Sequence, residues 1–235
     1  GLVSNRFNIR GTGELPFCET CTRMKSKRKP VKKHTATRAV HRGARVFTDL
    51  KEVEHRSAGG YKWAIHFIDD ATRYRKTYFL KRKADAWDAF RKYIEEECEP
   101  LGIKVQVLRC DGGTEYGRRG EVYTETSKFK QYLKSKPQGI VISIEKSPAY
   151  TPEMIGVVER YNQTMWNTIR CILHDQGRDE TLWPWAAKLA ERTLNVLPTS
   201  ALEDTTPYVE WYKKLPDTSM WKRPLCDAYA HQYGK

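Results

Sequence analysis

Three strand-like stretches follow one another between residues 44 and 80 and constrain the fold more than any other part of the chain. Residues 44–49 alternate apolar and polar side chains, and residues 61–69 and 74–80 continue the pattern. Gly59-Gly60 separates the first two stretches, and a tight turn at 70–72 separates the second and third. Short connections join antiparallel neighbours. The three stretches are therefore predicted to form an antiparallel meander.

The remainder of the chain alternates helical and strand-like patterns. The predicted helices span residues 84–98, 127–136, 153–175 and about 182–197, and further strands lie near Val107 and at 139–144. This order predicts an α/β fold in which helices cover a mixed five-stranded sheet. The tail to Lys235, rich in Pro and aromatic residues, is expected to wrap the core.

Each of three carboxylates lies where a strand or a helix would hold it rigidly. Asp49 closes the first strand-like stretch, Asp111 closes the stretch around Val107, and Glu159 lies early in the helix predicted over residues 153–175. Hard divalent cations such as Mg²⁺ bind carboxylate oxygens, and one or two such ions serve phosphodiester chemistry. The three side chains therefore predict a metal-dependent polynucleotidyl transferase.

Other carboxylates compete for these roles. Asp69 and Asp70 fall at a turn, where Asp commonly accepts backbone hydrogen bonds. Glu115 is interpreted as a loop residue. Glu153 precedes Glu159 by six positions, which is a rotation of about 240° on a helix, so the two cannot face one metal pair.

The charge of the chain predicts a polyanionic partner. The chain contains 42 Lys and Arg against 29 Asp and Glu, with a formal charge of +13 and a pI of about 9.4. Residues 23–45 hold ten basic residues and no acidic one. This run is either a solvated tail or localisation signal, or a segment that follows phosphates and releases their counterions. Its candidate phosphate contacts are Lys25, Lys27, Arg28, Lys29, Lys32, Lys33 and Arg38.

Further candidate contacts lie on the helix of Glu159. The polar or aromatic residues on its face are Asn162, Gln163, Trp166 and Arg170, which are either solvated or grip a DNA end. No apolar stretch approaches the roughly 20 residues of a membrane span, and no signal peptide is recognisable, so an intracellular, soluble chain is expected.

Two of the six cysteines are spaced for metal binding. Cys18 and Cys21 form a C-x₂-C pair, which can present two thiolates to one Zn²⁺. His34 and His41 lie nearby, but their separation does not match a zinc-finger His pair. The pair is either half of a zinc site or an unmetallated turn.

The motifs and their order resemble the integrase of copia-type LTR retrotransposons over nearly the whole chain. The resemblance begins at Phe17-Cys-Glu-Thr-Cys21 and the basic run. It then continues through Phe47-Thr-Asp49, Phe67–Arg73, Arg109–Tyr116, Tyr150–Arg160, Asn195–Thr199 and Thr206–Trp211.

The resemblance implies an RNase H-like catalytic core whose D-D-E carboxylates are Asp49, Asp111 and Glu159. It implies Mg²⁺ or Mn²⁺ as cofactor and a homo-oligomer on DNA that bridges element ends and target duplex. Cys18 and Cys21 would be the remnant of a His-His-Cys-Cys zinc module, with Zn²⁺ possible at the incomplete pair. A nuclear site of action, reached in a cytoplasmic particle, is expected.

The expected domains are the end of the zinc module at 1–22, a basic linker at 23–43, the catalytic core at 44–200 and a C-terminal extension at 201–235. The His pair before Cys18 is absent. Asp111 and Glu159 are 48 positions apart, longer than is usual in the family, which fits an insertion around 117–139. A core fragment or a shortened domesticated derivative is expected.

Three functions follow from these features. The first is an integrase that trims a 3′ end and joins it to target DNA. The second is an RNase H-like nuclease that uses only water as nucleophile, and the third is a non-catalytic DNA-binding derivative. The acidic triad counts against the third, and the zinc remnant and basic run favour the first over the second.

Overall fold

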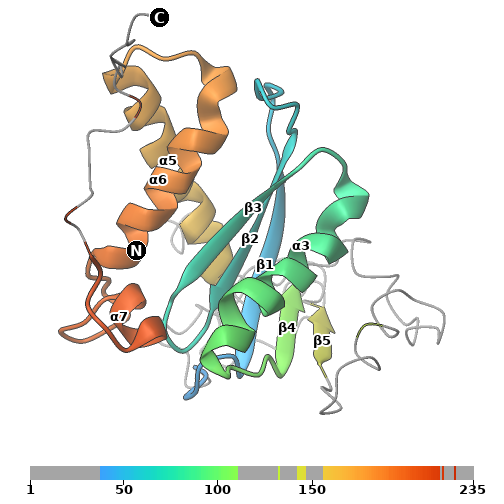
Figure 1. Ribbon diagram of the computed structural model, residues 1–235, viewed down its shortest axis with the longest axis vertical. Helices are drawn as coiled ribbons and strands as arrows, with labels where there is room; N and C mark the ends of the chain where they lie inside the picture. Colours follow the sequence, from blue (N-terminus) through green and yellow to red (C-terminus); the bar gives the residue numbers. More distant parts are fainter. Residues whose placement is uncertain are drawn as a thin grey trace, which may run out of the picture. The chain divides into compact units, whose positions relative to one another are not determined.

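A computed structural model of the chain describes residues 38–110, Tyr132, 142–146, 156–217, Ser219 and Leu225. All of these residues belong to the second of two units into which the chain divides, residues 36–235. Within them, five strands form one sheet in the order β3-β2-β1-β4-β5, and helices cover both of its faces (Figure 1).

The strands confirm the predicted meander and mixed sheet. β1 (Arg45–Glu52), β2 (Trp63–Asp69) and β3 (Arg75–Leu80) are successive antiparallel neighbours. β4 (Val107–Cys110) runs parallel to β1, and β5 (Ser143–Lys146) runs parallel to β4. β1 continues three residues beyond the predicted end at Asp49, because its pairing with β2 continues to Glu52 opposite Trp63.

The helices differ from the predictions mainly at their ends. η1 (Lys83–Asp85) leads into α3 (Ala86–Tyr93), which continues as the π-helical turn η2 (Ile94–Cys98) and the 3₁₀ turn η3 (Glu99–Leu101) rather than as one regular helix. The later helices are α5 (Gly156–Asp175), η6 (Glu180–Leu182), α6 (Trp183–Val196) and α7 (Pro207–Tyr212). Of the helix predicted at 127–136, only Tyr132 is described, and it is helical.

α7 is absent from the sequence prediction, although its start carries a recognisable signal. Thr206 is the N-cap, and its hydroxyl accepts a hydrogen bond from the backbone N–H of Val209. Pro207 occupies the first turn, where its missing N–H costs nothing. The described residues include no helix that is long and apolar enough to cross a bilayer.

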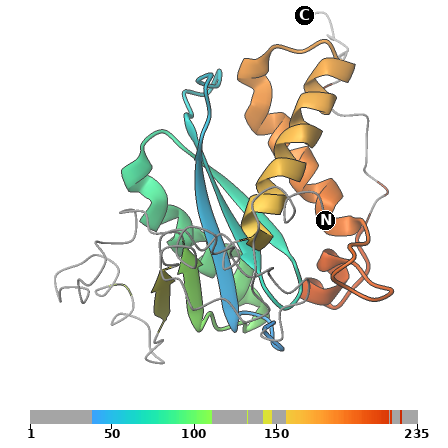
Figure 2. The same cartoon turned by 180° about the vertical axis from the view of Figure 1, so that it is seen from behind.

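Two apolar clusters fill the two sides of the sheet. The first lies between the sheet and α3, and the second lies between the sheet and the pair α5 and α6 (Figure 2). Side chains of β2 enter both clusters alternately, so this strand is buried on both faces. The second cluster contains an apolar stripe of α5 made of Val158, Tyr161, Met165, Ile169 and Leu173.

A buried carboxylate ties α7 to the sheet. Glu97 accepts hydrogen bonds from the hydroxyls of Tyr74 and Tyr212, both at 2.8 Å, and pairs with the ammonium of Lys76. Burial raises the pKa of Glu97, but the Lys76 ammonium and the two hydroxyls outweigh burial, so the pKa lies below its usual range. Tyr74 also stacks on Trp211 of α7, with ring centroids 4.8 Å apart.

Asn195 of α6 forms hydrogen bonds with the backbone of β3, the strand at the edge of the sheet. Its Nδ2 donates to the Arg75 carbonyl at 2.8 Å, and its Oδ1 accepts from the Arg75 N–H at 3.0 Å. The Asn195 side chain is buried. Two backbone groups that an edge strand would leave unpaired are thereby satisfied.

We expect Asn195→Ala to lower the free energy of unfolding by about 2 kcal/mol, because it removes both hydrogen bonds and leaves the Arg75 backbone without its partners. Urea denaturation of the full chain measures the change. Lys188→Ala, an exposed substitution on the same helix, is the control and should change stability by less than about 0.5 kcal/mol. Equal stability of the two variants would contradict the bridging role of Asn195.

Candidate active site

The docking of α5 on the sheet brings its N-terminal turns beside Asp49. The apolar stripe of α5 packs into the second cluster and thereby fixes the rotation of the helix about its axis. Asn162 Nδ2 donates a hydrogen bond of 2.5 Å to Asp49 Oδ2 on β1. Glu159 precedes Asn162 by three residues, about 4.5 Å along the axis and on the same side of the helix. Two of the three predicted carboxylates thus lie on elements joined at this point.

The third predicted carboxylate, Asp111, lies outside the described residues. The described part of β4 ends at Cys110, one residue earlier. β4 is parallel to β1, with Phe47 opposite Arg109. Each of these two residues precedes its predicted carboxylate by two positions.

The carboxylates of the site differ in exposure from those that hold the fold together. Asp49 is half-buried and Glu159 is exposed. Asp69 and Asp70 are almost fully buried, as residues of the predicted turn. Asp69 accepts from the Gly43 and Thr72 N–H groups, both at 2.8 Å, so its carboxylate is engaged within the fold.

The Asp70 carboxylate is likewise engaged by groups of the fold. It accepts a hydrogen bond from the Ala39 N–H at 2.9 Å and forms ion pairs with Arg45 and Arg73. Burial raises the pKa of Asp69, and its hydrogen bonds from Gly43 and Thr72 oppose that rise. The turn role predicted for both aspartates is confirmed.

The described donors fit a hard divalent cation. Asp49 and Glu159 supply carboxylate oxygens, which Mg²⁺ and Mn²⁺ prefer. Asn162 Oδ1 is buried and has no hydrogen-bond partner in the described structure, so a further oxygen donor lies at the same place. Among the described residues, no group of three or more His, Cys, Asp or Glu side chains gathers as a metal site. The predicted ligand set also includes Asp111, which lies outside the described residues.

A groove extends along α5 from this site. Its volume is about 870 Å³, and its lining on α5 runs from Asn162 to His174. The predicted DNA contacts Gln163 and Arg170 line this groove, and so does Trp166, whose ring lies 5.7 Å from that of Trp183. The opposite wall comes from the end of β1 and the segment after it, Lys51–His55. The groove thus gathers candidate contacts that the sequence placed on one helix face.

Arg38 is the one candidate contact of the basic run, residues 23–45, that the structure describes. Its guanidinium donates to the backbone carbonyls of Asp70, Ala71 and Ala201. Arg42 similarly donates to the carbonyl of Trp211 at 2.5 Å. These contacts join the beginning of the described chain to the segment that carries α7. The other candidate contacts of the basic run, and the cysteine pair, lie outside the described residues: Cys18, Cys21, Lys25, Lys27, Arg28, Lys29, Lys32 and Lys33.

Three residues next to the site were not among the sequence candidates. His66, opposite Asp49 on β2, is fully buried, and Thr77, opposite His66 on β3, is almost so. Tyr161 of α5 packs on the His66 ring. A histidine within an otherwise apolar strand was the available signal, but only the strand register places it beside Asp49.

The chain is similar in sequence to parts of two plant Pol polyproteins. It is 32% identical over 187 residues to the retrovirus-related Pol polyprotein from transposon TNT 1-94 of Nicotiana tabacum, which covers 79% of this chain and 13% of that protein. Identity is 25% over 216 residues to the corresponding polyprotein from transposon RE2 of Arabidopsis thaliana, covering 92% and 14%. The chain therefore spans about one seventh of the length of these relatives. No protein-family model matches the chain.

Solved structures share the fold. A chain of the simian T-cell lymphotropic virus intasome, in complex with PP2A regulatory subunit B56 gamma, aligns with a TM-score of 0.59 at 15% identity, over 92% of this chain and 69% of that one. The HTLV-2 integrase catalytic core domain in complex with magnesium aligns with a TM-score of 0.50 at 18% identity, over 72% and 97%. The chain thus belongs with the retrovirus-related Pol proteins of plant copia-type transposons, and it has the RNase H-like fold of an integrase catalytic core.

Proposed function

We propose that this chain is the catalytic core of a retrotransposon integrase, a D-D-E polynucleotidyl transferase that inserts element DNA into target DNA. The Asp49–Asn162 hydrogen bond carries the proposal, because it joins the strand of Asp49 to the helix of Glu159. The same fold in integrase cores supports it. Asp111 completes the proposed triad.

The proposed roles follow from the positions of the side chains. Asp49, Asp111 and Glu159 hold Mg²⁺ or Mn²⁺, and Asn162 orients Asp49. When bound, such ions activate the attacking oxygen and stabilise the leaving oxygen. The magnesium complex of the HTLV-2 core supports this choice of ion. Gln163 and Arg170 of the groove wall contact the DNA end.

The proposed reaction has two steps at one site. In trimming, a water oxygen attacks a phosphorus near the end of the element and displaces the 3′ oxygen, which leaves a new 3′-hydroxyl. In joining, that hydroxyl attacks a phosphorus of the target duplex and displaces the target 3′ oxygen. The second step requires two duplexes held in line, which proximity and orientation on the protein must supply.

The proposal also covers the oligomeric state of the protein and the roles of its N-terminal segment. The protein is proposed to act as a homo-oligomer that bridges two element ends, which the simian intasome and the trimeric HTLV-2 core support by analogy. Cys18 and Cys21 are proposed Zn²⁺ ligands, and the basic linker is proposed to follow phosphates. The proposed place of action is the nucleus, where the target duplex lies.

The integrase is distinguished from a plain nuclease by its nucleophile. A short duplex of the element end, labelled on the trimmed strand, is incubated with the full chain, target DNA and Mg²⁺ or Mn²⁺. Longer joined products support the integrase, and shortened products alone support the nuclease. Binding without any product supports a non-catalytic DNA-binding protein. A parallel sample carries a complete His-His-Cys-Cys module in place of residues 1–22, so that failure of assembly is separated from failure of chemistry.

We expect Asp49→Asn, Asp111→Asn and Glu159→Gln each to reduce trimming and joining by roughly 100-fold or more, because each removes a charge that holds a divalent ion. DNA affinity, measured by fluorescence anisotropy, should remain nearly unchanged. Asp88→Asn, an exposed change on α3 at the other face of the sheet, is the control and should retain activity. Full Mg²⁺-dependent activity in any of the three variants would refute the assignment of that carboxylate.

Asn162→Ala tests the bond that carries the proposal. We expect the affinity for Mg²⁺ to fall by about 10-fold to 100-fold, as is usual when a hydrogen bond that orients a metal-binding carboxylate is lost. Isothermal titration calorimetry on the DNA-free protein measures this affinity. Asn167→Ala, an exposed change on the same helix, should leave it unchanged, and equal affinity in both variants would show that Asn162 does not orient Asp49.

The basic linker is tested by substitution rather than deletion, because Arg38 and Arg42 bind carbonyls of the core. We expect Gln at positions 25, 27, 28, 29, 32 and 33 to flatten the slope of log K for DNA against log salt by up to about 5. Gln at the exposed Lys92, Lys104 and Lys214 controls for charge alone. A slope unchanged by the linker substitutions would identify this run as a tail or an address signal.

A further inference from the structure

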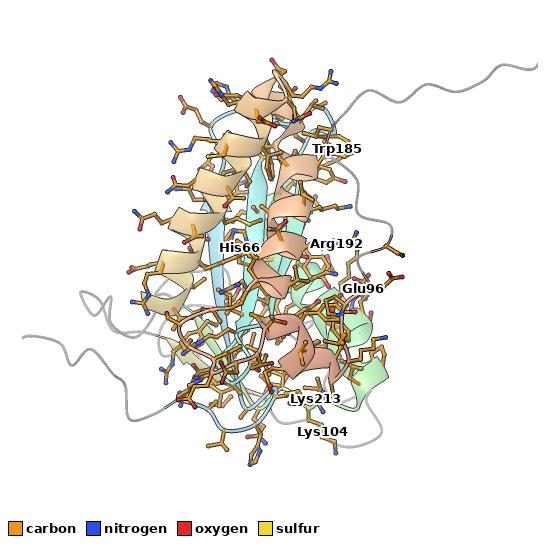
Figure 3. The ribbon with its side chains drawn as sticks, turned by 90° about the vertical axis from the view of Figure 1, so that its left-hand side faces the viewer. His66, Glu96, Lys104, Trp185, Arg192 and Lys213 are labelled. Atoms are coloured by element: carbon orange, nitrogen blue, oxygen red, sulfur yellow. The ribbon has the colours of Figure 1, made fainter. Side chains whose placement is uncertain are left out.

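A row of polar side chains crosses the sheet beneath α5. Asp49 of β1 lies directly opposite His66 of β2, and His66 lies directly opposite Thr77 of β3. Residues directly opposite in antiparallel strands project from the same face. This is the face that α5 and α6 cover, and in Figure 3 His66 is labelled between these two helices.

α5 contacts this row through two consecutive residues. Tyr161 meets the His66 ring edge-on, with centroids 5.2 Å apart and planes at 88°, and its hydroxyl lies 3.4 Å from Thr77 Oγ1. Asn162, the next residue, donates to Asp49. The row therefore makes polar contacts with the same turn of α5 that carries Glu159.

His66 makes the fold less stable than an apolar residue of similar size would at this position. Its side chain is fully buried, and Nδ1 lies 2.9 Å from Thr77 Oγ1. Nε2 is buried and has no hydrogen-bond partner in the described structure. Burial lowers the pKa of His66 to about 3, so the ring is neutral. An unsatisfied buried nitrogen is unfavourable, and an apolar ring of similar size would avoid it. Stability alone does not explain a histidine at this place.

We propose that His66 is a positioning residue that sets α5 against β1, and through it the placement of Glu159 and Asn162 relative to Asp49. The His66 ring bears on Tyr161, two residues after Glu159 and one before Asn162. A shift of Tyr161 on the sheet would therefore move both neighbours along or around the helix axis. This inference rests on the proposed function, because it concerns the affinity of the carboxylates for a divalent ion.

The test separates positioning from stability. His66→Leu removes the ring and the unsatisfied nitrogen, while Thr77 Oγ1 keeps the Tyr161 hydroxyl nearby. We expect this variant to be as stable as the original chain in urea, yet to bind Mg²⁺ about tenfold more weakly in calorimetry. Ile65→Val, at the next position of β2 and on the opposite face, is the matched control. It should unfold at a lower urea concentration than the original chain and keep its Mg²⁺ affinity.

Tyr161→Leu removes the same ring contact from the side of α5. It tests the inference independently if His66→Leu does not fold. We expect a similar loss of Mg²⁺ affinity, and a double variant no weaker than the weaker single one, because both changes break one contact. Additive losses, or unchanged affinity in a folded His66 or Tyr161 variant, would overturn the inference. Asp49→Asn sets the baseline: if it binds Mg²⁺ as well as the original chain does, the proposed function fails and not the role of His66.

Discussion

The docking of α5 on the sheet is the contact on which the candidate site depends. Its apolar stripe supplies most of the free energy, since a fully buried aliphatic or aromatic side chain contributes about 1.5–3 kcal/mol. The hydrogen bond from Asn162 to Asp49 contributes about 1 kcal/mol. The stripe therefore holds the helix on the sheet, and the hydrogen bond joins its N-terminal turns to β1. Both the carboxylate pair and the groove beside it follow from that position.

Charged side chains also hold together the beginning of the described chain and the segment that carries α7. Arg38 and Arg42 donate to backbone carbonyls of the segments near Ala201 and Trp211. Glu97 gathers Tyr74, Tyr212 and Lys76 around one buried carboxylate. Breaking such a group is costly because its charge would remain buried without partners. Arg38 and Arg42, at the end of the basic run, thus belong to the core.

The proposed metal-binding carboxylates, Asp49 and Glu159, are more exposed to solvent than Asp69 and Asp70. Asp69 and Asp70 are enclosed by backbone N–H groups and arginines, which occupy their oxygens. Glu159 is exposed on α5, and Asp49 is half-buried beside Asn162. This difference in exposure favours Asp49, in the middle of β1, over Asp69 and Asp70 as the proposed metal ligand.

The amino-acid sequence by itself determined the element types, the meander and the residues of the proposed triad. Alternation in β1 to β3, and the spacing of Trp87, Phe90 and Ile94, are local patterns that need no partner to be recognised. Tertiary structure alone decided the register that sets Asp49 opposite His66, the hydrogen bond from Asn162, and the hydrogen bonds of Arg38 to distant carbonyls. It also broke the predicted helix at Tyr93 into a π-helical turn and added α7. The reason is physical: periodicity reports which face of an element is apolar, whereas register and side-chain partners depend on groups tens of residues away, whose positions no local pattern contains.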